Sequence, residues 1–473
     1  MPFSRHNRII LALASLLILT VGNSCSSLDI FTGQSRRPNI LLIITDDQPL
    51  QSIAYMPNVQ GELIGQGVEF TNAYATTPLC CPSRASILTG LYAHNHNVLT
   101  NRPPQGGATA FDDSSTLALW LQEAGYHTAL IGKYLNNYDG LEPFGYVPPG
   151  WDVWDAFLTG GPNNRGFYYS YTMSDNGKVV QYADRAEDYS TDVVTKRALE
   201  FIRDKQNRPF LLILSYYAPH QTYLPAPRHK DLFKTEAEFS LHRPPNYYES
   251  DITDKPEWLT TMPPVEAEHV DGVYQRILRS LMSVDESVGQ ITDLLEEKGM
   301  RENTLILYTS DNGMSLGENT VFGKNCPYET CLKIPFIVSY PALISRPSVS
   351  EDFVLNIDIA PTIAELAGVT IPGEVDGLSF MPLLRKEETT WRDAFLFEHF
   401  QELDTEEEGL TSAIPTFHGV RTPDWKYVEY ESGEKELYDL VNDPFEMENL
   451  IYDSSNADIV SSLQMQLRDL KQK

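Results

Sequence analysis

The stretch ILLIITDD at residues 40–47 decides the fold, because an unbroken apolar run is followed at once by two carboxylates. An apolar run that does not alternate with polar residues predicts a strand buried on both faces, as in a parallel sheet. Similar runs occur at residues 128–131, 210–214 and 305–308. Helical patterns lie between them, so the sequence predicts an α/β domain whose mostly parallel sheet is flanked by helices. These helices are predicted at residues 117–124, 191–202 and 277–297.

The sequence changes character near residue 390. Residues 425–430 and 435–438 alternate in polarity across Ser432-Gly433, which predicts a β-hairpin. A last helix is predicted at residues 459–470. We therefore expect two domains in the mature chain. They are an α/β domain at residues 37–388 and a small C-terminal α+β domain, with an antiparallel sheet and a final helix, at residues 389–473.

Acidic residues dominate the charge of the chain. The 473 residues include 36 Lys plus Arg against 65 Asp plus Glu, which gives a formal net charge of −29. This balance argues against nucleic-acid binding, which depends on basic side chains that neutralise phosphates, and against docking onto anionic membranes. A polyanionic substrate would be repelled at long range, so it would need a local basic pocket.

The N-terminus resembles a targeting segment. A positively charged start precedes an apolar run at residues 9–21, which is too short to span a bilayer as an ordinary helix. We expect a signal peptide at residues 1–24 and therefore an exported chain. Cys25 has small residues, Gly22 and Ser24, at −3 and −1, and it also resembles the lipidated cysteine of a bacterial lipoprotein. Secretion, a periplasmic location and a lipid anchor at Cys25 all remain open, and the anchor would be the one expected membrane contact.

Polar residues follow the first and last of the four predicted strands. Asp46 and Asp47 follow the first strand, and Asp311 and Asn312 follow the strand at residues 305–308. Each pair alone is more often a turn or a helix cap. Because open α/β sheets bind ligands beyond the carboxyl ends of their strands, the four side chains together predict a site for a hard cation. Oxygen donors suit Ca²⁺ or Mg²⁺ and do not suit zinc.

The strand at residues 128–131 runs into Gly132-Lys133, and the strand at residues 210–214 runs into Ala218-Pro219-His220. A single histidine is more often a scaffold residue, and a single lysine is usually solvated. Their position at the same rim as the predicted cation site makes that rim a complement for an anionic group.

The most specific segment is CCPSRASILTG at residues 80–90. Pro82 suits the first position of a helix and Gly90 suits its end. Cys80 would then lie just before a helix N-terminus, where the helix dipole lowers the pKa of a thiol. A structural or disulfide-bonded Cys80 fits this pattern equally well, although a disulfide with the adjacent Cys81 would be strained. Elsewhere, Cys326 and Cys331 are five residues apart, which predicts a small disulfide loop in an exported chain.

The order Cys-x-Pro-Ser-Arg, followed by Leu-Thr-Gly, resembles the signature of the type I sulfatases. The sequences around the strand-end residues, Lys324 and the C-terminal Leu437-Tyr438-Asp439-Leu440 are also similar to that family, so the resemblance covers about residues 37–453. It implies an alkaline-phosphatase-like fold and hydrolysis of sulfate esters. It also implies that a maturation enzyme converts Cys80 to Cα-formylglycine, whose hydrated gem-diol is the nucleophile.

The resemblance implies a role for each site residue. A divalent cation, Ca²⁺ or Mg²⁺, would be held by a set of five residues, namely Asp46, Asp47, Asp311, Asn312 and the converted Cys80. Arg84 would stabilise the gem-diol. Lys133 and Lys324 would bind sulfate oxygens, and His220 would contact the sulfate and protonate the leaving alkoxide.

Two positions depart from the family pattern. Leu135 stands where many members have a histidine that assists the nucleophile, which leaves the general base open. Residues 316–319 read Leu-Gly-Glu-Asn where Leu-Gly-Glu-His is common, so no role carries over to Asn319.

Within the family, residues 80–98 and 132–136 resemble the N-acetylglucosamine-6-sulfatase group. Related endosulfatases carry long basic tracts, which this chain lacks, so we expect an exo-acting enzyme that degrades a glycosaminoglycan or another sulfated polysaccharide. Two alternatives remain: a phosphonate or phosphate-ester hydrolase on the same scaffold, and an inactive glycan-binding homologue.

Overall fold

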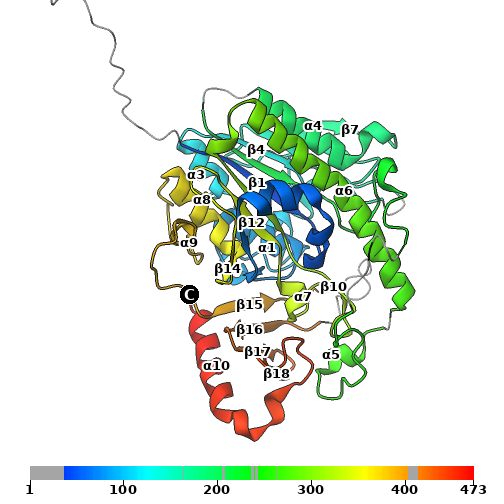
Figure 1. Cartoon of the computed structure of the whole chain (residues 1–473), viewed down its shortest axis with the longest axis vertical. Coiled ribbons are helices and arrows are strands. Elements are labelled where there is room, and N and C mark those ends of the chain that lie inside the picture. The colour runs from blue at the N-terminus through cyan, green and yellow to red at the C-terminus, as the bar shows by residue number, and fades with distance from the viewer. Residues whose placement is uncertain are drawn as a thin grey trace, which may run out of the picture. The chain divides into compact units, whose positions relative to one another are not determined.

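A ten-stranded mixed sheet organises the computed structural model (Figure 1). Its centre is five parallel strands in the order β9, β1, β8, β4 and β5. These strands are Thr304–Ser310, Asn39–Thr45, Phe210–Ser215, His127–Gly132 and Val153–Phe157. Four of these five strands were predicted and are confirmed, each one to three residues longer than expected, whereas β5 was not predicted.

The edges of this sheet are mixed rather than parallel. β12 (Phe336–Ser339) is antiparallel to β9 and to β2 (Val68–Phe70), and β13 (Ser348–Ser350) is parallel to β2. At the other edge, β6 (Thr172–Asp175) and β7 (Lys178–Gln181) form an antiparallel ribbon beside β5. These five strands are short, and the apolar-run pattern did not identify them.

The structure describes residues 37–162, 165–204, 208–235, 239, 243–263, 265–402 and 414–473. The predicted signal peptide at residues 1–24 and the candidate lipidation site at Cys25 lie outside these residues. Among the described residues, no helix is long and apolar enough to cross a membrane.

Helices cover both faces of the sheet, because alternate residues of the central strands belong to different apolar layers. Ile40, Leu42 and Ile44 belong to one layer, and Leu41 and Ile43 belong to the other. The first layer contains α1 (Cys80–Thr89), α3 (Leu117–Glu123), α8 (Ile359–Ala367) and α9 (Met381–Arg385). The second contains α4 (Ser190–Arg203) and α6 (Ala267–Glu297) (Figure 1). Burial on both faces explains why the central strands are apolar throughout.

Helix α6 begins ten residues before the predicted start at Ile277. Its first turns bury Val270, Val273 and Tyr274, whose helical spacing places them on one face. The prediction missed these turns because charged residues interrupt the apolar pattern there.

The C-terminal part forms a separate four-stranded antiparallel sheet, as expected. It consists of β15 (Phe395–His399), β16 (Phe417–Arg421), β17 (Trp425–Tyr430) and β18 (Lys435–Asp439), followed by α10 (Ala457–Leu470). Backbone bonding joins this sheet to the α/β part, since Glu398 N donates to Thr76 O at 2.8 Å. The boundary at residue 389 stays a prediction.

Candidate active site

The carboxyl ends of the central strands bring the predicted acidic residues together. Asp46 and Asp47 follow β1, and Asp311 and Asn312 follow the neighbouring β9. Asp47 N donates to Asp311 Oδ1 at 3.1 Å, and Asn312 Nδ2 donates to Asp47 Oδ1 at 2.8 Å. Asp47 adopts a φ of 59°, a backbone conformation that residues other than glycine rarely take and that often marks a functional site.

Helix α1 delivers Cys80 to this cluster. The helix begins at Cys80 itself, two residues before the predicted start at Pro82, and ends at Gly90 in the left-handed conformation. The Cys80 thiol lies 3.4 Å from Asp46 Oδ1 and 3.6 Å from Asp47 Oδ1. Cys80 and Cys81 are both free, so the vicinal disulfide does not form.

The prediction that the Cys80 thiol has a lowered pKa is wrong. Burial, reinforced by the Asp47 carboxylate, raises the pKa well above its ordinary value, and Lys133 and Lys324 do not reverse this. The helix dipole is a weaker effect than the complete removal of the thiol from water. As an ordinary cysteine, residue 80 is therefore not an activated thiolate.

Arg84 links α1 to three strand ends. Its Nε donates to Asp311 Oδ2 at 2.8 Å, and its Nη1 donates to Ser215 Oγ at 2.6 Å and to Lys133 O at 3.1 Å. A guanidinium has donors that point in several fixed directions, so one buried side chain can satisfy all three acceptors.

Two lysines and a histidine complete the cluster. Lys133 Nζ lies 2.5 Å from Asp46 Oδ2, and Lys324 Nζ lies 3.0 Å from both oxygens of Asp47 and 2.9 Å from Cys80 Sγ. His220 Nε2 lies 3.5 Å from Asp47 Oδ2.

The charges of the cluster act on one another because all of these groups are buried. Burial alone would raise the pKa of Asp46, but Lys133, His220 and Arg84 outweigh it and lower that pKa. The pKa of Asp311 is raised, first by burial and then by the Asp46 carboxylate, against the effect of Arg84. A further positive charge beside the Asp311 carboxylate would therefore stabilise its ionised form.

The donor set fits a divalent cation. The oxygen Oδ1 of Asn312 is buried and has no hydrogen-bond partner among the described residues. Asp46, Asp47, Cys80 and His220 offer possible ligand atoms that all lie within 4.8 Å of one another. His220 was predicted only as a catalytic residue, so its proximity to the metal group is an addition to the predicted set. Several carboxylate oxygens and one amide oxygen are the ligands that Ca²⁺ and Mg²⁺ prefer.

A cavity of about 430 Å³ opens beside Lys133 and His220. Aromatic side chains, including Tyr134 and Tyr217, form part of its wall, and it also contains polar groups. These polar groups include Asn101, Arg102, Asn136, Asn137, Asp139 and Glu402. Leu135 lines the same cavity and is nearly fully buried, so this position supplies no acid or base.

Sequence reasoning missed several residues of this region. Ser215 could have been found, because it is the first polar residue after the apolar run of β8. Glu402 had no such signal, since only the tertiary structure brings the segment after β15 to the cavity. Two further histidines are bonded within the fold: His94 Nδ1 bonds to Glu398, and His96 bonds to Ser86.

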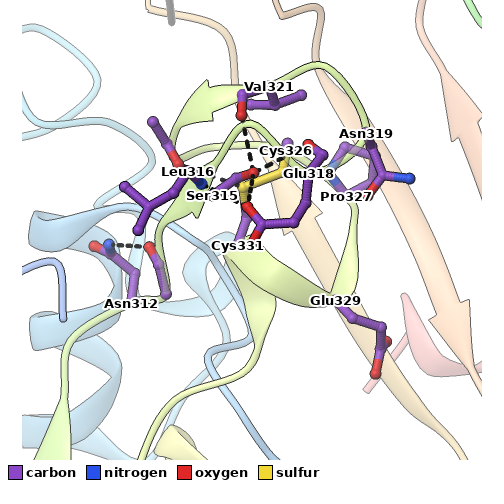
Figure 2. The surroundings of a disulfide bond; sticks show 12 residues. Asn312, Ser315, Leu316, Glu318, Asn319, Val321, Cys326, Pro327, Glu329 and Cys331 are labelled. Atoms are coloured by element: carbon purple, nitrogen blue, oxygen red, sulfur yellow. Dashed lines mark hydrogen bonds between the residues drawn. A yellow bond between two sulfur atoms is a disulfide. The ribbon is translucent and has the colours of Figure 1, made fainter. Parts of the chain in front are cut away.

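The predicted disulfide between Cys326 and Cys331 is present. It lies close to Lys324 in the sequence, in a loop that also contains Ser315, Glu318 and Asn319 (Figure 2).

Comparison with known proteins gives the family. Residues 38–369 match the family described as Sulfatase, and residues 317–473 match the one described as N-sulphoglucosamine sulphohydrolase, C-terminal. The first match covers more than half of the chain. The chain belongs to the sulfatase family.

Relatives of this sulfatase-family chain include enzymes that act on sulfated sugars by name. The N-acetylglucosamine-6-O-sulfatase of Bacteroides thetaiotaomicron is 30% identical, over 99% of this chain and 91% of its own length. The human N-acetylglucosamine-6-sulfatase is 32% identical, over 92% of this chain and 85% of its own length. A Caenorhabditis elegans homolog of an extracellular sulfatase is 40% identical over 76% of this chain, which spans only about half of that relative (52%).

Solved structures of sulfatases and related hydrolases share the fold. A protein in complex with its substrate D-glucosamine-2-N,6-O-disulfate superposes with a TM-score of 0.76 at 27% identity, covering 92% of this chain and 98% of that one. The phosphonate monoester hydrolase of Agrobacterium radiobacter superposes with a TM-score of 0.74 at 23% identity, over 92% and 95% of the two chains. The alkaline-phosphatase-like fold expected for a sulfatase is thus confirmed.

Proposed function

We propose that the chain is an exported sulfuric ester hydrolase that removes a sulfate group from a sulfated hexosamine. One observation carries this proposal: a single buried cluster joins Cys80, in the signature helix, to the carboxylates of Asp46 and Asp47 and to Lys133 and Lys324. With a divalent cation added, the positive charges of this cluster exceed its negative charges. A chain of net charge −29 therefore carries a local site that suits one anionic group.

In this proposal, a maturation enzyme converts Cys80 to Cα-formylglycine. The hydrated aldehyde supplies two hydroxyls on one carbon, one for displacement of the alcohol and one for the later release of sulfate. The rest of the cluster prepares that position. Asp46 Oδ1, Asp47 Oδ1 and Lys324 Nζ lie 3.4, 3.6 and 2.9 Å from Cys80 Sγ, the atom whose place the hydroxyls would take, so these three side chains would orient the hydrated group.

Asp46, Asp47, Asp311 and Asn312 would hold the cation together with the converted residue 80, and the lone Asn312 Oδ1 supports this assignment. A bound Ca²⁺ or Mg²⁺ supplies Lewis acidity toward a sulfate oxygen. Arg84 fixes the direction of the Asp311 carboxylate, because its Nε donates to Oδ2 while Oδ1 accepts from two backbone amides.

Lys133 and Lys324 bind sulfate oxygens in this proposal, since the ammonium group of Lys133 lies beside Asp46 and that of Lys324 lies beside Asp47. His220 Nδ1 lies 2.9 Å from Gln221 O and therefore carries its own hydrogen as a donor. A proton that His220 gives to the leaving alkoxide, which becomes the product alcohol, would consequently come from Nε2, the atom that lies 3.5 Å from Asp47 Oδ2.

The cavity beside Lys133 supports a sugar as the leaving group. Its volume of about 430 Å³ lies at the small end of the range for ligand sites. Aromatic rings such as Tyr134 and Tyr217 can pack against the apolar face of a sugar ring, and Asn136 and Glu402 can bond to hydroxyls. These features favour an exo-acting enzyme that takes a terminal sulfated residue. The names of the relatives and the glucosamine disulfate bound to a similar structure support a 6-sulfated hexosamine.

Export is the second part of the proposal. The predicted signal peptide at residues 1–24 and the two extracellular sulfatase relatives support it. Whether Cys25 carries a lipid is tested by mass spectrometry of the mature N-terminus in the native cell.

The deciding experiment is a rate comparison on enzyme whose Cys80 conversion has been measured by mass spectrometry. We expect release of inorganic sulfate from N-acetylglucosamine 6-sulfate and from an aryl sulfate, and no release by the Cys80→Ala variant. A higher kcat/KM on an aryl phosphodiester would replace the sulfatase with a phosphonate or phosphate-ester hydrolase. Sugar binding without turnover by converted protein would identify an inactive glycan-binding homologue.

A further inference from the structure

Lys324 is the one ammonium group of the cluster that no strand of the large sheet positions. It follows β11 (Phe322–Gly323), which pairs with β10 (Ser315–Leu316) in a separate two-stranded ribbon. A lysine side chain has four flexible carbons, so its ammonium is placed only as well as its backbone is held. The 2.9 Å contact from Lys324 Nζ to Cys80 Sγ therefore requires a rigid loop.

Lys324 lies in a loop at residues 315–331, and Asn319 holds the first half of this loop. It is fully buried, and its side-chain amide and backbone N–H are bonded to parts of the chain outside the loop. Its backbone N donates to Asn246 O at 2.8 Å, and its Oδ1 accepts from Asn246 Nδ2 at 2.9 Å. Its Nδ2 donates to Phe445 O at 3.0 Å and to Glu446 O at 3.2 Å. Asn319 thereby attaches the loop to the segment that follows β18.

The second half is held by the disulfide and by the same segment. The Cys326–Cys331 bond closes a loop that begins two residues after Lys324. Glu446 accepts a hydrogen bond from Glu329 N at 2.8 Å, so the segment that bonds to Asn319 also bonds beside the disulfide. Lys426 Nζ bonds to Glu446 at 2.5 Å and donates to Pro327 O at 3.1 Å.

Local bonds stiffen the ribbon between these two attachments. The Glu318 carboxylate accepts from Ser315 Oγ at 3.0 Å and from Leu316 N at 2.6 Å, next to the disulfide (Figure 2). The backbone is thus fixed on both sides of Lys324.

We propose that Asn319 and the Cys326–Cys331 disulfide are positioning elements, which hold the Lys324 ammonium against Asp47 and residue 80. This inference rests on the proposed function, because it assigns Lys324 to the reacting sulfate. It also makes the C-terminal sheet part of the catalytic assembly, since Lys426 and Glu446 take part in the attachment. Asn319, which departs from the family pattern, therefore has a positioning role in this chain.

The first test is Asn319→Gly. Asn319 has a φ of 49°, a conformation that glycine adopts without strain, so this change removes the amide bonds and leaves the backbone free to keep its shape. We expect kcat/KM for an aryl sulfate to fall about tenfold, because small displacements of a charged group strongly reduce its effect on the transition state. The matched control is Asn176→Gly. Asn176 has the same φ of 49°, and its Oδ1 accepts a hydrogen bond from Trp154 N at the far edge of the sheet. Its kcat/KM should stay within twofold of wild type.

A double-mutant cycle separates positioning from general damage. If Asn319 acts through Lys324, Asn319→Gly should change kcat/KM less than twofold in a Lys324→Ala background. If the two effects multiply, the proposal is overturned.

The second readout does not depend on activity. Acetic anhydride labelling of Lys324, followed by mass spectrometry, should be at least fivefold faster in Asn319→Gly and in Cys326→Ser/Cys331→Ser than in wild type. An unchanged labelling rate in Asn319→Gly overturns the proposal, even where the cysteine variant fails to fold. Failure of converted wild-type protein to release sulfate would contradict the proposed function instead, and the labelling result would still stand.

Discussion

A methyl group added at Gly132 should disable the site without touching any charged residue. Gly132 ends β4 directly before Lys133 and has a φ of 117°. A Cβ at this position would lie 1.8 Å from Ser215 O and 2.8 Å from Ser215 C, both in the backbone of β8. Neither atom can rotate away, so the two strand ends must separate.

The required displacement follows from these distances. Restoring the Cβ to ordinary contact at 3.4 Å moves the strand ends apart by about 1.6 Å. This would break the bond from Lys133 N to Ser215 O, now 2.8 Å, and withdraw Lys133 Nζ from Asp46. A misplacement of about 1 Å costs on the order of 10²-fold in rate, so we expect Gly132→Ala to lower kcat/KM about 10²-fold. Overpacking and backbone strain should together lower the free energy of unfolding by about 2–5 kcal/mol.

The matched control is Gly125→Ala. Gly125 has a φ of 90°, and an added Cβ there meets nothing within 4 Å. It therefore suffers backbone strain of about 1–2 kcal/mol without any displacement of the site. Both variants are compared by aryl sulfate kinetics at equal Cys80 conversion and by urea unfolding followed by tryptophan fluorescence. The reasoning is refuted if the kcat/KM of Gly132→Ala is within threefold of that of Gly125→Ala.

Three further predictions concern bonding, pH and metal. Arg84→Lys should lower the free energy of unfolding by about 3 kcal/mol, because one ammonium cannot replace the guanidinium bonds to both Ser215 Oγ and a backbone carbonyl; a loss under 1 kcal/mol in urea unfolding would contradict this. Burial lowers the pKa of His96 to about 3. Below pH 6.5 the unfolded state therefore binds a proton on His96 that the folded state does not bind, so the wild-type protein should lose stability as the pH falls toward 4. His96→Gln should be less sensitive to acid by up to about 1.4 kcal/mol per pH unit, and parallel stability curves would exclude this role. Chelation with EDTA should abolish sulfate release and lower the unfolding temperature, and Ca²⁺ or Mg²⁺ should restore both; full activity after verified metal removal would show that the cluster needs no cation.

Much of the site could be predicted because it lies at the ends of strands. The central strands are buried on both faces, and this burial produces the unbroken apolar runs that mark them. Each run ends where the chain leaves the core, so polar residues that follow it, such as Asp46 and Lys133, come together at one rim of the sheet. The edge strands were missed because their few residues carry no such pattern.

The sequence by itself determined the family, the parallel centre of the sheet, and the positions of Cys80, Asp46 and Asp311, because each depends on neighbours in the chain. The tertiary structure alone decided the high pKa of the Cys80 thiol, the bond from Arg84 to Ser215, and the attachment of Asn319. These features depend on burial and on partners more than a hundred residues away. Local pattern carries no information about such contacts, since desolvation and long-range hydrogen bonds exist only once the chain has folded.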